Sequence, residues 1–449
     1  MFEKILIANR GEIAVRIIRA CRELGIKTVA IYSVADEEAL HTQLADEAIC
    51  IGPAPSKDSY LDITRVISAA VITKATAIHP GFGFLSENPT FAQVCEDSNI
   101  ILIGPTAEMI EAMGNKAEAR KRMIAAGIPV VPGSDGIVAD LNQARAIAKK
   151  IGYPMIVKAS SGGGGKGMRV INNEGELEKN FLMAQKEALA SFNDDRMYME
   201  RYVVDPKHIE FQILADEMGH TIHLGERDCS IQRRHQKMVE EAPSSQLTPK
   251  KRAKMGAMAV KAAKSIAYRN AGTVEFLLEA SGDFFFMEMN TRIQVEHPIT
   301  EMITGIDLIK KQIEIAAGLP LGLTQKDVVL RGHAIECRIN AENPSKGFRP
   351  SPGTIEYLHM PGGKGIRVDS AIYNGYTVPP LYDSMLAKLI VHADTRQEAI
   401  LKMNSALGEF VATGIETNID YHMDLLHQQA FIDGDYNTGF IEKVMGSYK

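Results

Sequence analysis

Acidic, amide and basic side chains are concentrated in one short segment, residues 288–297, with the sequence EMNTRIQVEH. The four residues before it, 284–287, are FFFM, which is typical of a buried strand. Polar groups that directly follow an apolar strand predict a cleft at the strand end, because a solvated loop would spread such groups toward water. We therefore expect this segment to bind or transform a polar ligand.

Glu288 in this segment is expected to lie opposite a second carboxylate, Glu275. The runs Thr273–Leu278 and Phe284–Asn290 read as strands, and a turn centred on residues 281–282 would join them as a hairpin. In that register Glu275 and Glu288 are direct cross-strand partners, with Cβ atoms about 5 Å apart. Two carboxylates so placed repel each other and destabilise a sheet.

A divalent cation between Glu275 and Glu288 would remove this repulsion. Asn290, two residues along the same strand face, could supply a third oxygen ligand. All-oxygen sites suit Mg²⁺ or Mn²⁺ bound together with substrate phosphates. The alternative is a solvated pair at a sheet edge without a metal, which the apolar surroundings disfavour.

A glycine-rich loop, SSGGGGKGM at residues 160–168, predicts a phosphate-binding element. It lies between two strand-like runs, YPMIVKA at 153–159 and RVI at 169–171, and Lys158 and Lys166 flank the glycines. Glycine allows the backbone to approach phosphate oxygens and to donate N–H groups to them. The loop does not fit GxxxxGK[ST], and its GxGxxG match lacks the other protein-kinase motifs. The alternative is a flexible surface linker.

Basic side chains are frequent in a second segment, residues 227–237, and Glu240 and Glu241 follow closely. A run of charges usually forms a solvated face. The mixture of signs could equally hold an anionic substrate, so both interpretations stay open. The basic and histidine residues are Arg227, Arg233, Arg234, His235 and Lys237.

The composition is that of an ordinary globular protein with several domains. The chain has 449 residues, 45% hydrophobic and 24% charged, with a net charge of -6. This charge predicts no general attraction to nucleic acid or to an anionic membrane. The five cysteines are scattered, and no signal-peptide pattern or long apolar run appears, so we expect a cytoplasmic protein with reduced thiols.

The elements around these motifs predict an α/β fold. Residues 4–8, 12–24 and 27–32 read as strand, helix and strand, which places an open parallel α/β domain at about residues 1–115. The first turn, Asn-Arg-Gly-Glu, lacks the glycines of a dinucleotide-binding fingerprint. Residues 331–391 are rich in glycine, proline and β-formers and predict a mainly antiparallel region, and helices are expected at 308–317 and 397–407.

Together the motifs resemble the biotin carboxylase family of the ATP-grasp superfamily. The resemblance covers essentially the whole chain, through KILIANRGEIAVRIIRA, HPGFGFLSEN, KASSGGGGKGM, ERDCSIQRRHQK, EMNTRIQVEHPITE and GHAIECRINAE. It implies four parts. They are an N-terminal α/β domain (1–115), linker helices and a glycine-loop lid (116–203), an ATP-grasp core (204–330) and a C-terminal domain (331–449).

The resemblance implies that the protein phosphorylates bicarbonate with ATP and transfers the carboxyl group to biotin on a carrier protein. ATP and Mg²⁺ (or Mn²⁺) would bind here, whereas biotin would not be attached to this chain. The implied ATP-binding residues are Lys116, Lys158, Gly164, Gly165, Glu200, Arg201, Tyr202, Val203, His208, His235, Glu275 and Glu288, with the metal held by Glu275, Glu288 and Asn290.

The resemblance also implies residues for the carboxyl-transfer half of the reaction. Glu296 corresponds to the general base that activates bicarbonate, and Arg338 to the residue that binds biotin and stabilises charge on its ureido oxygen. The implied bicarbonate-binding residues are Lys237, Arg292, Gln294 and Val295, and Lys237 and Arg292 also count as catalytic.

The expected partners are a biotin carboxyl carrier protein and carboxyltransferase subunits, because no biotin-attachment sequence follows the catalytic part. A homodimer is implied by the resemblance alone. We expect the first half-reaction of acetyl-CoA carboxylase in fatty acid synthesis, with a pyruvate or other acyl-CoA carboxylase subunit as the alternative. Two further alternatives are another ATP-grasp carboxylate–amine ligase and a non-catalytic nucleotide-binding protein.

Overall fold

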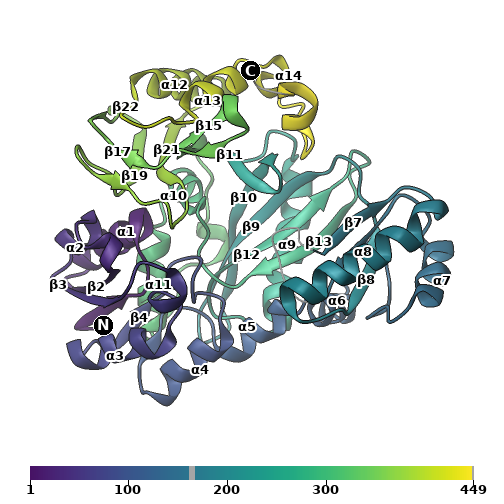
Figure 1. The fold of residues 1–449 in the computed structure, drawn as a ribbon, viewed down its shortest axis with the longest axis horizontal. Coiled ribbons are helices and arrows are strands. Elements are labelled where there is room, and N and C mark those ends of the chain that lie inside the picture. The colour runs from purple at the N-terminus through teal and green to yellow at the C-terminus, as the bar shows by residue number, and fades with distance from the viewer. Residues whose placement is uncertain (161–166, 447–449) are drawn as a thin grey trace.

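The computed structural model of the protein describes residues 1–160 and 167–446. A long antiparallel sheet crosses the centre of the molecule, with a parallel sheet on one side of it and a small antiparallel sheet at the far end (Figure 1). This mixture of an N-terminal parallel α/β domain and antiparallel sheets confirms the predicted fold class. In the described parts of the chain, no helix is long and apolar enough to cross a membrane.

The N-terminal domain is a parallel sheet covered by helices, in strand order β3-β2-β1-β4-β5. The predicted opening strand, helix and strand are all present, and the helix buries Ile13, Ile17 and Cys21 on one face. The elements are β1 (Lys4–Ile7), α1 (Gly11–Glu23), β2 (Lys27–Ser33), α2 (Leu40–Leu44), β3 (Glu47–Gly52), α3 (Ile63–Thr73), β4 (Ala77–His79), α4 (Pro89–Asp97), β5 (Ile101–Leu102) and α5 (Ala107–Gly114).

A small antiparallel sheet, in order β7-β6-β8, follows at the opposite end of the molecule (Figure 1). The strands β6 and β7 flank the glycine-rich loop as predicted and pair antiparallel. Helix α8 packs against both strands and shares a buried core with α7. The elements are α6 (Lys116–Ala125), α7 (Leu141–Ile151), β6 (Met155–Ala159), β7 (Met168–Ile171), α8 (Glu174–Phe192) and β8 (Met197–Arg201).

The central sheet has the order β13-β12-β9-β10-β11-β14-β21-β19. It continues across the predicted domain boundary between residues 330 and 331, because β11 pairs with β14. Its elements are β9 (Lys207–Ala215), β10 (Thr221–Arg233), β11 (Gln236–Ala242), α9 (Pro249–Ser265), β12 (Asn270–Leu278), β13 (Phe284–Asn290), α10 (His297–Thr304), α11 (Leu308–Ala316), β14 (His333–Asn340), β19 (Ile366–Ser370) and β21 (Met385–Ala393).

The C-terminal region is antiparallel as predicted, and helix α12 covers one face of β21 and β14. Short strands and helices complete a core with Leu389, Val391 and Met403. These elements are β15 (Glu342–Asn343), β16 (Arg349–Pro350), β17 (Gly353–Thr354), β18 (Tyr357–His359), β20 (Thr377–Val378), α12 (Arg396–Glu409), β22 (Val411–Thr413), α13 (Ile419–Leu426) and α14 (Gln429–Ile432).

The two faces of the central sheet have different roles. Helix α9 packs on one face, where Phe211, Phe276 and Phe286 belong to a buried apolar cluster. The other face, toward α10, carries charged residues in the middle of the sheet. The strand end at residues 291–296, which leads from β13 into α10, borders this charged face.

Candidate active site

Three carboxylates and an arginine form a row across four neighbouring strands, which we call the acid row: Glu288, Glu275, Glu210 and Arg227. Glu275 on β12 lies opposite Glu288 on β13, as predicted, and also opposite Glu210 on β9. Glu210 in turn lies opposite Arg227 on β10. Directly opposed residues point to the same sheet face, so these carboxylates share one environment. The sequence indicated only the first pair of the row.

Lys237 on β11 is the cation that joins the acid row to the strand end. Its Nζ lies 2.5 Å from Glu210 Oε2, 3.2 Å from Glu275 Oε1 and 2.5 Å from Glu296 Oε1. Burial disfavours the ammonium, but these carboxylates outweigh burial and raise the pKa of Lys237 well above its usual value. Lys237 is therefore a fixed positive charge at the centre of the cluster.

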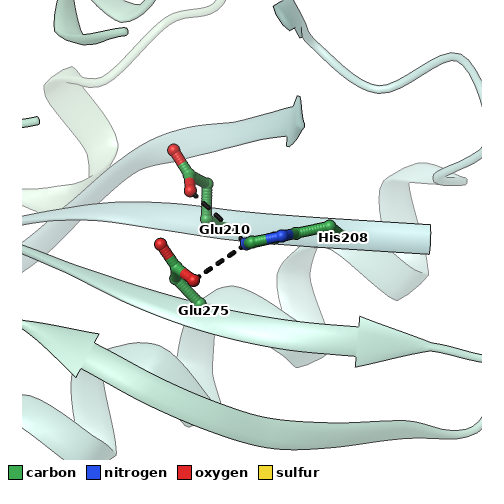
Figure 2. Close-up of side chains that lie close together, drawn as sticks. All are labelled: His208, Glu210 and Glu275. Atoms are coloured by element: carbon green, nitrogen blue, oxygen red, sulfur yellow. Dashed lines mark ion pairs between the residues drawn. The ribbon is translucent and has the colours of Figure 1, made fainter. Parts of the chain in front are cut away.

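His208 lies between two carboxylates of the acid row (Figure 2). Its Nε2 is 2.9 Å from Glu275 Oε2 and 3.7 Å from Glu210 Oε2. Its Nδ1 lies 2.7 Å from the side-chain nitrogen of Gln232. Burial lowers the pKa of His208, but Glu275 outweighs burial and raises it. These ligand-type groups lie close enough to share a cation, yet Lys237 and Arg227 already supply positive charge there.

Arg227 is wholly buried and is held by side chains on every side. Its guanidinium donates to Glu210 at 2.6 Å and to Gln294 at 2.6 Å. The other acceptors are Gln212 at 2.7 Å, Thr300 at 3.0 Å and Thr273 at 3.1 Å. The basic segment is therefore divided, because Arg227 and Lys237 face the cluster while Arg234 and His235 are exposed at the β10–β11 turn.

Arg292, in the strand end, forms hydrogen bonds with one residue of the N-terminal domain and with one residue of β13. Its Nε donates to Glu87 Oε2 at 2.8 Å, and its Nη2 donates to Asn290 Oδ1 at 3.0 Å. Glu87 belongs to the HPGFGFLSENP loop of the N-terminal domain and also accepts from the Thr291 backbone at 3.1 Å. Glu87 outweighs the effect of burial and raises the pKa of Arg292, so the guanidinium is a permanent cation at this edge.

Side chains of the central sheet hold the next residues of the strand end, Gln294 and Val295, by hydrogen bonds. Gln294 accepts from Arg227 at 2.6 Å and donates to Glu275 at 2.8 Å. The Val295 carbonyl accepts from the buried Lys388 Nζ at 3.0 Å. These contacts hold the backbone that leads into Glu296, which precedes α10.

Glu296 lies between two cations. Its Oε1 is 2.5 Å from Lys237 Nζ, and its Oε2 is 3.0 Å from Arg338 Nη2. Burial opposes ionisation, but these cations hold the pKa of Glu296 well below its usual range. Arg338 on β14 also pairs with Glu240 on β11, whose Oε1 lies 2.6 Å from Nη2. The structure thus brings Lys237, Glu296 and Arg338 into one connected group.

Lys116 and Lys158 lie near the outer end of the acid row. Lys116 Nζ is 3.4 Å from Glu288 Oε2, and Lys158 pairs with Glu200. Burial disfavours both ammonium groups, but their carboxylate partners outweigh burial and raise the pKa of each lysine. Two ammonium groups beside Glu288 can neutralise phosphate oxygens and accompany a metal ion.

The other predicted nucleotide residues differ in how they are placed. Glu200 and Arg201 end β8, Tyr202 and Val203 follow it, and Arg201 pairs with Glu279 at 2.7 Å. For His235, no hydrogen bond or ion pair joins it to the cluster within residues 1–160 and 167–446. Gly164 and Gly165 lie outside the described residues.

The predicted metal ligands fit a cation in part. Glu275 and Glu288 are opposed carboxylates, as an all-oxygen site requires. Asn290 lies on the same strand, but its Nδ2 donates to Glu275 at 2.8 Å and its Oδ1 accepts from Arg292. The two carboxylates therefore fit Mg²⁺ directly, whereas Asn290 would have to give up its bond to Arg292 to become a ligand.

Sequence reasoning missed several residues that hold this cluster. Glu210 and Lys388 belong to no recognisable motif. Glu87 and Gln232 lie within segments that carry the resemblance, and Glu240 lies in the mixed-charge segment, but no pattern assigned these residues a role. Cross-strand register could have identified Glu210, since it follows His208 by two residues in a run with strand-like alternation. The missed residues are Glu87, Glu210, Gln232, Glu240 and Lys388.

Comparison with known families supports the resemblance along the whole chain. Residues 1–110 match the family described as biotin carboxylase, N-terminal domain. Residues 115–324 match the carbamoyl-phosphate synthase L chain, ATP binding domain. Residues 336–443 match the biotin carboxylase C-terminal domain.

Individual relatives are similar over their full length. "Biotin carboxylase 1" of Bacillus subtilis is 58% identical over 450 residues, covering 100% of both chains. A crystal structure of a biotin carboxylase–β,γ-ATP complex from Campylobacter jejuni is 49% identical, with a TM-score of 0.96 and 99% of each chain covered. The biotin carboxylase domain dimer of Hydrogenobacter thermophilus 2-oxoglutarate carboxylase, solved with MgADP, ADP and bicarbonate, is 52% identical with a TM-score of 0.97. The match covers 100% of this chain and 99% of that one.

Proposed function

Because the chain belongs to the biotin carboxylase family, we propose that the cluster around Lys237 catalyses the ATP-dependent carboxylation of biotin by bicarbonate. The products are ADP, phosphate and carboxybiotin. The observation that carries the proposal is the position of Glu296, an ionised carboxylate held 2.5 Å from Lys237 and 3.0 Å from Arg338. One base thus lies between a cation suited to an anionic substrate and a cation suited to a developing oxyanion.

ATP binds at the outer end of the acid row, next to Glu288. Lys116 and Lys158 bind phosphate oxygens, and the segment Glu200 to Val203 binds adenine, with His208, His235, Gly164 and Gly165 as further contacts. Glu275 and Glu288, with Asn290 beside them, hold Mg²⁺. A cation held by these residues would supply positive charge to the phosphate oxygens during phosphoryl transfer. The ion pair between Lys116 and Glu288 supports this placement, because both residues then face the same phosphates.

Bicarbonate binds at the strand end. Lys237, Arg292, Gln294 and the Val295 backbone surround it, and Arg292 can hold a planar anion through two parallel hydrogen bonds. Glu296 accepts the bicarbonate proton, which makes the remaining oxygen a better nucleophile toward phosphorus. A bound anion shares the positive charge of Lys237, so the pKa of Glu296 rises and Glu296 becomes a stronger base when substrate is present.

Biotin binds next to Arg338. Its ureido oxygen becomes negative when the ring N–H gives up its proton to a base, before the nitrogen attacks the carboxyl group, and a guanidinium aimed at that oxygen stabilises the charge. Arg338 suits this role because Glu296 and Glu240 fix its orientation while it stays fully charged. Arg338 stays positively charged throughout the reaction, since guanidinium groups remain protonated in proteins.

The biotin is presented by a carrier protein, and carboxyltransferase subunits use the product. The biotin carboxylase domain of Hydrogenobacter thermophilus 2-oxoglutarate carboxylase was solved as a dimer, which supports a homodimer, and other relatives are named as subunits of pyruvate carboxylase. Acetyl-CoA is the final acceptor we propose, with pyruvate or another acyl-CoA as the alternative.

The cytoplasm is the proposed compartment, supported by the five free cysteines. The four predicted domain ranges are proposed as functional units.

The proposal is tested by ADP release from purified protein with Mg²⁺ and ATP, with and without bicarbonate and free biotin. We expect release to require bicarbonate and to increase with biotin, as the phosphoryl acceptor and the carboxyl acceptor respectively. Release that ignores both would contradict the proposal. Dependence on an amine instead would indicate a carboxylate–amine ligase, and the absence of nucleotide turnover would indicate a non-catalytic protein.

A further inference from the structure

Two buried glutamates lie directly behind Arg338, on the face of the sheet that α10 covers. Glu336 on β14 precedes Arg338 by two residues, so both side chains point to the same face. Glu240 on β11 is the cross-strand partner of Glu336. Both side chains are fully buried, with 0% exposure. Opposed residues have Cβ atoms about 5 Å apart, so two carboxylates here would repel strongly.

Among the residues that the structure describes, three of the four carboxylate oxygens of Glu336 and Glu240 have no hydrogen-bond donor. Glu240 Oε1 accepts from Arg338, whose Nε is 2.7 Å away. Glu240 Oε2 and both oxygens of Glu336 are buried and have no donor among the residues that the structure describes. A buried carboxylate without a donor is costly, and the cost is greatest when the group is ionised. One proton between Glu336 and Glu240 would satisfy an oxygen of each.

The cations and titratable groups that face Glu336 do not provide a free counter-charge. Arg338 is already shared by Glu240 and Glu296. Lys388 on β21 lies opposite Arg338, but its Nζ is engaged by Val295 at 3.0 Å, Glu12 at 3.1 Å and Asp369 at 3.8 Å. On α10, burial holds the pKa of His297 well below its usual value, so this imidazole is neutral.

We propose that Glu336 is a protonated carboxylic acid at neutral pH, that it donates its proton to Oε2 of Glu240, and that it is a positioning residue for Arg338. The donor satisfies the second oxygen of Glu240, while the first oxygen accepts from Arg338. The pair then carries a single negative charge, and Arg338 balances it.

The titration behaviour of the two groups is consistent with this geometry. Burial raises the pKa of Glu336 well above its usual value, although Lys388 acts in the opposite direction. Burial also raises the pKa of Glu240, to about 7, although Arg338 lowers it. Because the two carboxyls interact, they hold one proton as a pair, and Glu336 is the member without a cation at hydrogen-bond distance.

The proton shared by Glu336 and Glu240 determines in which direction the Arg338 guanidinium is attracted. With the proton present, one negative charge lies behind the guanidinium and Glu296 lies in front of it at 3.0 Å. A second negative charge behind Arg338 would pull the guanidinium away from Glu296 and from biotin. This inference rests on the proposed role of Arg338 in biotin binding, but the protonation of Glu336 can be measured separately.

Infrared difference spectroscopy of native protein minus Glu336→Gln tests the protonation directly. Native protein at pH 7 should show the C=O stretch of a protonated carboxyl, and Glu336→Gln should lack it. The matched control Glu356→Gln, at an exposed glutamate of the same region, should retain the band. If Glu336→Gln removes only carboxylate bands, the inference is wrong, whatever the protein catalyses.

Kinetics then test the positioning role. Glutamine keeps the size and the donor of a protonated acid, so Glu336→Gln should keep kcat for biotin carboxylation within about threefold of native. Glu336→Leu leaves Glu240 Oε2 without a donor and should lower kcat about tenfold or more. Equal losses in the two variants would contradict positioning through the donated proton.

The two proposals fail in different ways. A protein that shows the infrared band but no biotin-dependent ADP release would retain the protonated Glu336 and contradict the proposed function. A protein that carboxylates biotin but shows no such band would retain the function and contradict this inference.

Discussion

At the residue scale, the acid row depends on one buried arginine. Arg227 has no exposure and donates to Glu210 and Gln294, each at 2.6 Å. Glu210 is also fully buried, and the cations nearest its carboxylate are Arg227 at 2.6 Å and Lys237 at 2.5 Å, with His208 Nε2 3.7 Å away. Gln294 belongs to the strand end, so the same guanidinium joins charge balance to the position of the proposed bicarbonate site.

Replacing Arg227 with methionine should destabilise the protein by about 3–5 kcal/mol, because it leaves the buried carboxylate of Glu210 with less than its full counter-charge. Adding Glu210→Gln should recover part of that loss, since the second change removes the excess negative charge. Thermal denaturation of the native, single-variant and double-variant proteins measures both effects. A single variant as stable as the native protein would contradict this account of the row.

Only part of this charged cluster could be predicted from the sequence. The hairpin argument found Glu275 and Glu288 because turn, strands and register could be read locally. Glu210 and Lys388 join the site through strands distant in the chain, and their partners depend on the strand order β12-β9-β10 and β14-β21. No local pattern encodes that order, so strand-like alternation could place Glu210 on the face of His208 but could not identify the partners of Glu210 or Lys388.

At the element scale, two bulges direct charged residues to the site. The register of β12 with β13 shifts between Glu275 and Phe276, so Met287 is an extra residue. As a result Phe286 packs in the apolar cluster under α9, while Glu288 faces Glu275 on the other side. A strict two-residue alternation would have placed Phe286 and Glu288 on one face. The predicted pairing was correct, but the regular hairpin expected around it was wrong.

The second bulge acts on Lys237. The pairing of β10 with β11 shifts between Ile231 and Gln232, which leaves Met238 without a partner between Lys237 and Val239. Val239 packs in the C-terminal apolar core, whereas Lys237 reaches Glu210 and Glu296. A bulge re-aims side chains in this way at the cost of one ladder position. The sequence of this segment alone could not show which charges turn inward.

The opposite face of β11 is joined to the C-terminal elements by Glu241. Its carboxylate lies 2.8 Å from His333 Nε2 on β14 and 2.7 Å from Arg396 Nε on α12, and it accepts from Tyr436. Burial alone would raise the pKa of Glu241, but these donors outweigh burial and lower it to about 2. The group is therefore stabilising when ionised.

Glu241→Gln should lower stability by on the order of 3 kcal/mol at pH 7, because the pKa falls from an ordinary 4.5 to about 2 on folding. A lowered carboxyl pKa stabilises the fold above the unfolded-state pKa. The contribution is then lost as the pH falls from about 4.5 toward 2. Calorimetric melting of both proteins from pH 7 to pH 3 should show the difference shrinking, mainly below the unfolded-state pKa. A difference that grows as the pH falls would contradict the ionised assignment.

At the scale of the whole molecule, the N-terminal domain completes a site that the central sheet builds. The Asn9 side chain donates to the carbonyls of Pro80 and Phe82, at 2.7 and 2.8 Å, and so fixes the HPGFGFLSENP loop. Gly81 has a φ of +62°, and a Cβ there would lie 2.9 Å from Asn9 Nδ2, so glycine is required. This loop carries Glu87 to Arg292.

The rest of the N-terminal domain is attached to the same region through α1 and β2. Arg16 pairs with Glu301 of α10 at 2.9 Å, and Glu12 lies 3.1 Å from Lys388. Ser33 and Tyr382 share a hydrogen bond of 2.5 Å between the parallel sheet and the C-terminal region. Any shift of this domain relative to the central sheet would therefore move the partner of Arg292.

Glu87→Gln should raise KM for bicarbonate by about tenfold with a smaller change in kcat, because a charge-assisted hydrogen bond contributes about 1.5–3 kcal/mol. Glu87 holds Arg292 Nε at 2.8 Å without lying among the proposed phosphate ligands, so the effect should fall on the anion and leave KM for ATP unchanged. The matched control is Glu96→Gln, an exposed glutamate of the same domain. Steady-state ADP release with bicarbonate and ATP varied separately measures each constant, and thermal denaturation checks that the domain stays folded. Equal rises in both KM values, or none in either, would show that the N-terminal domain does not position Arg292 for the anion.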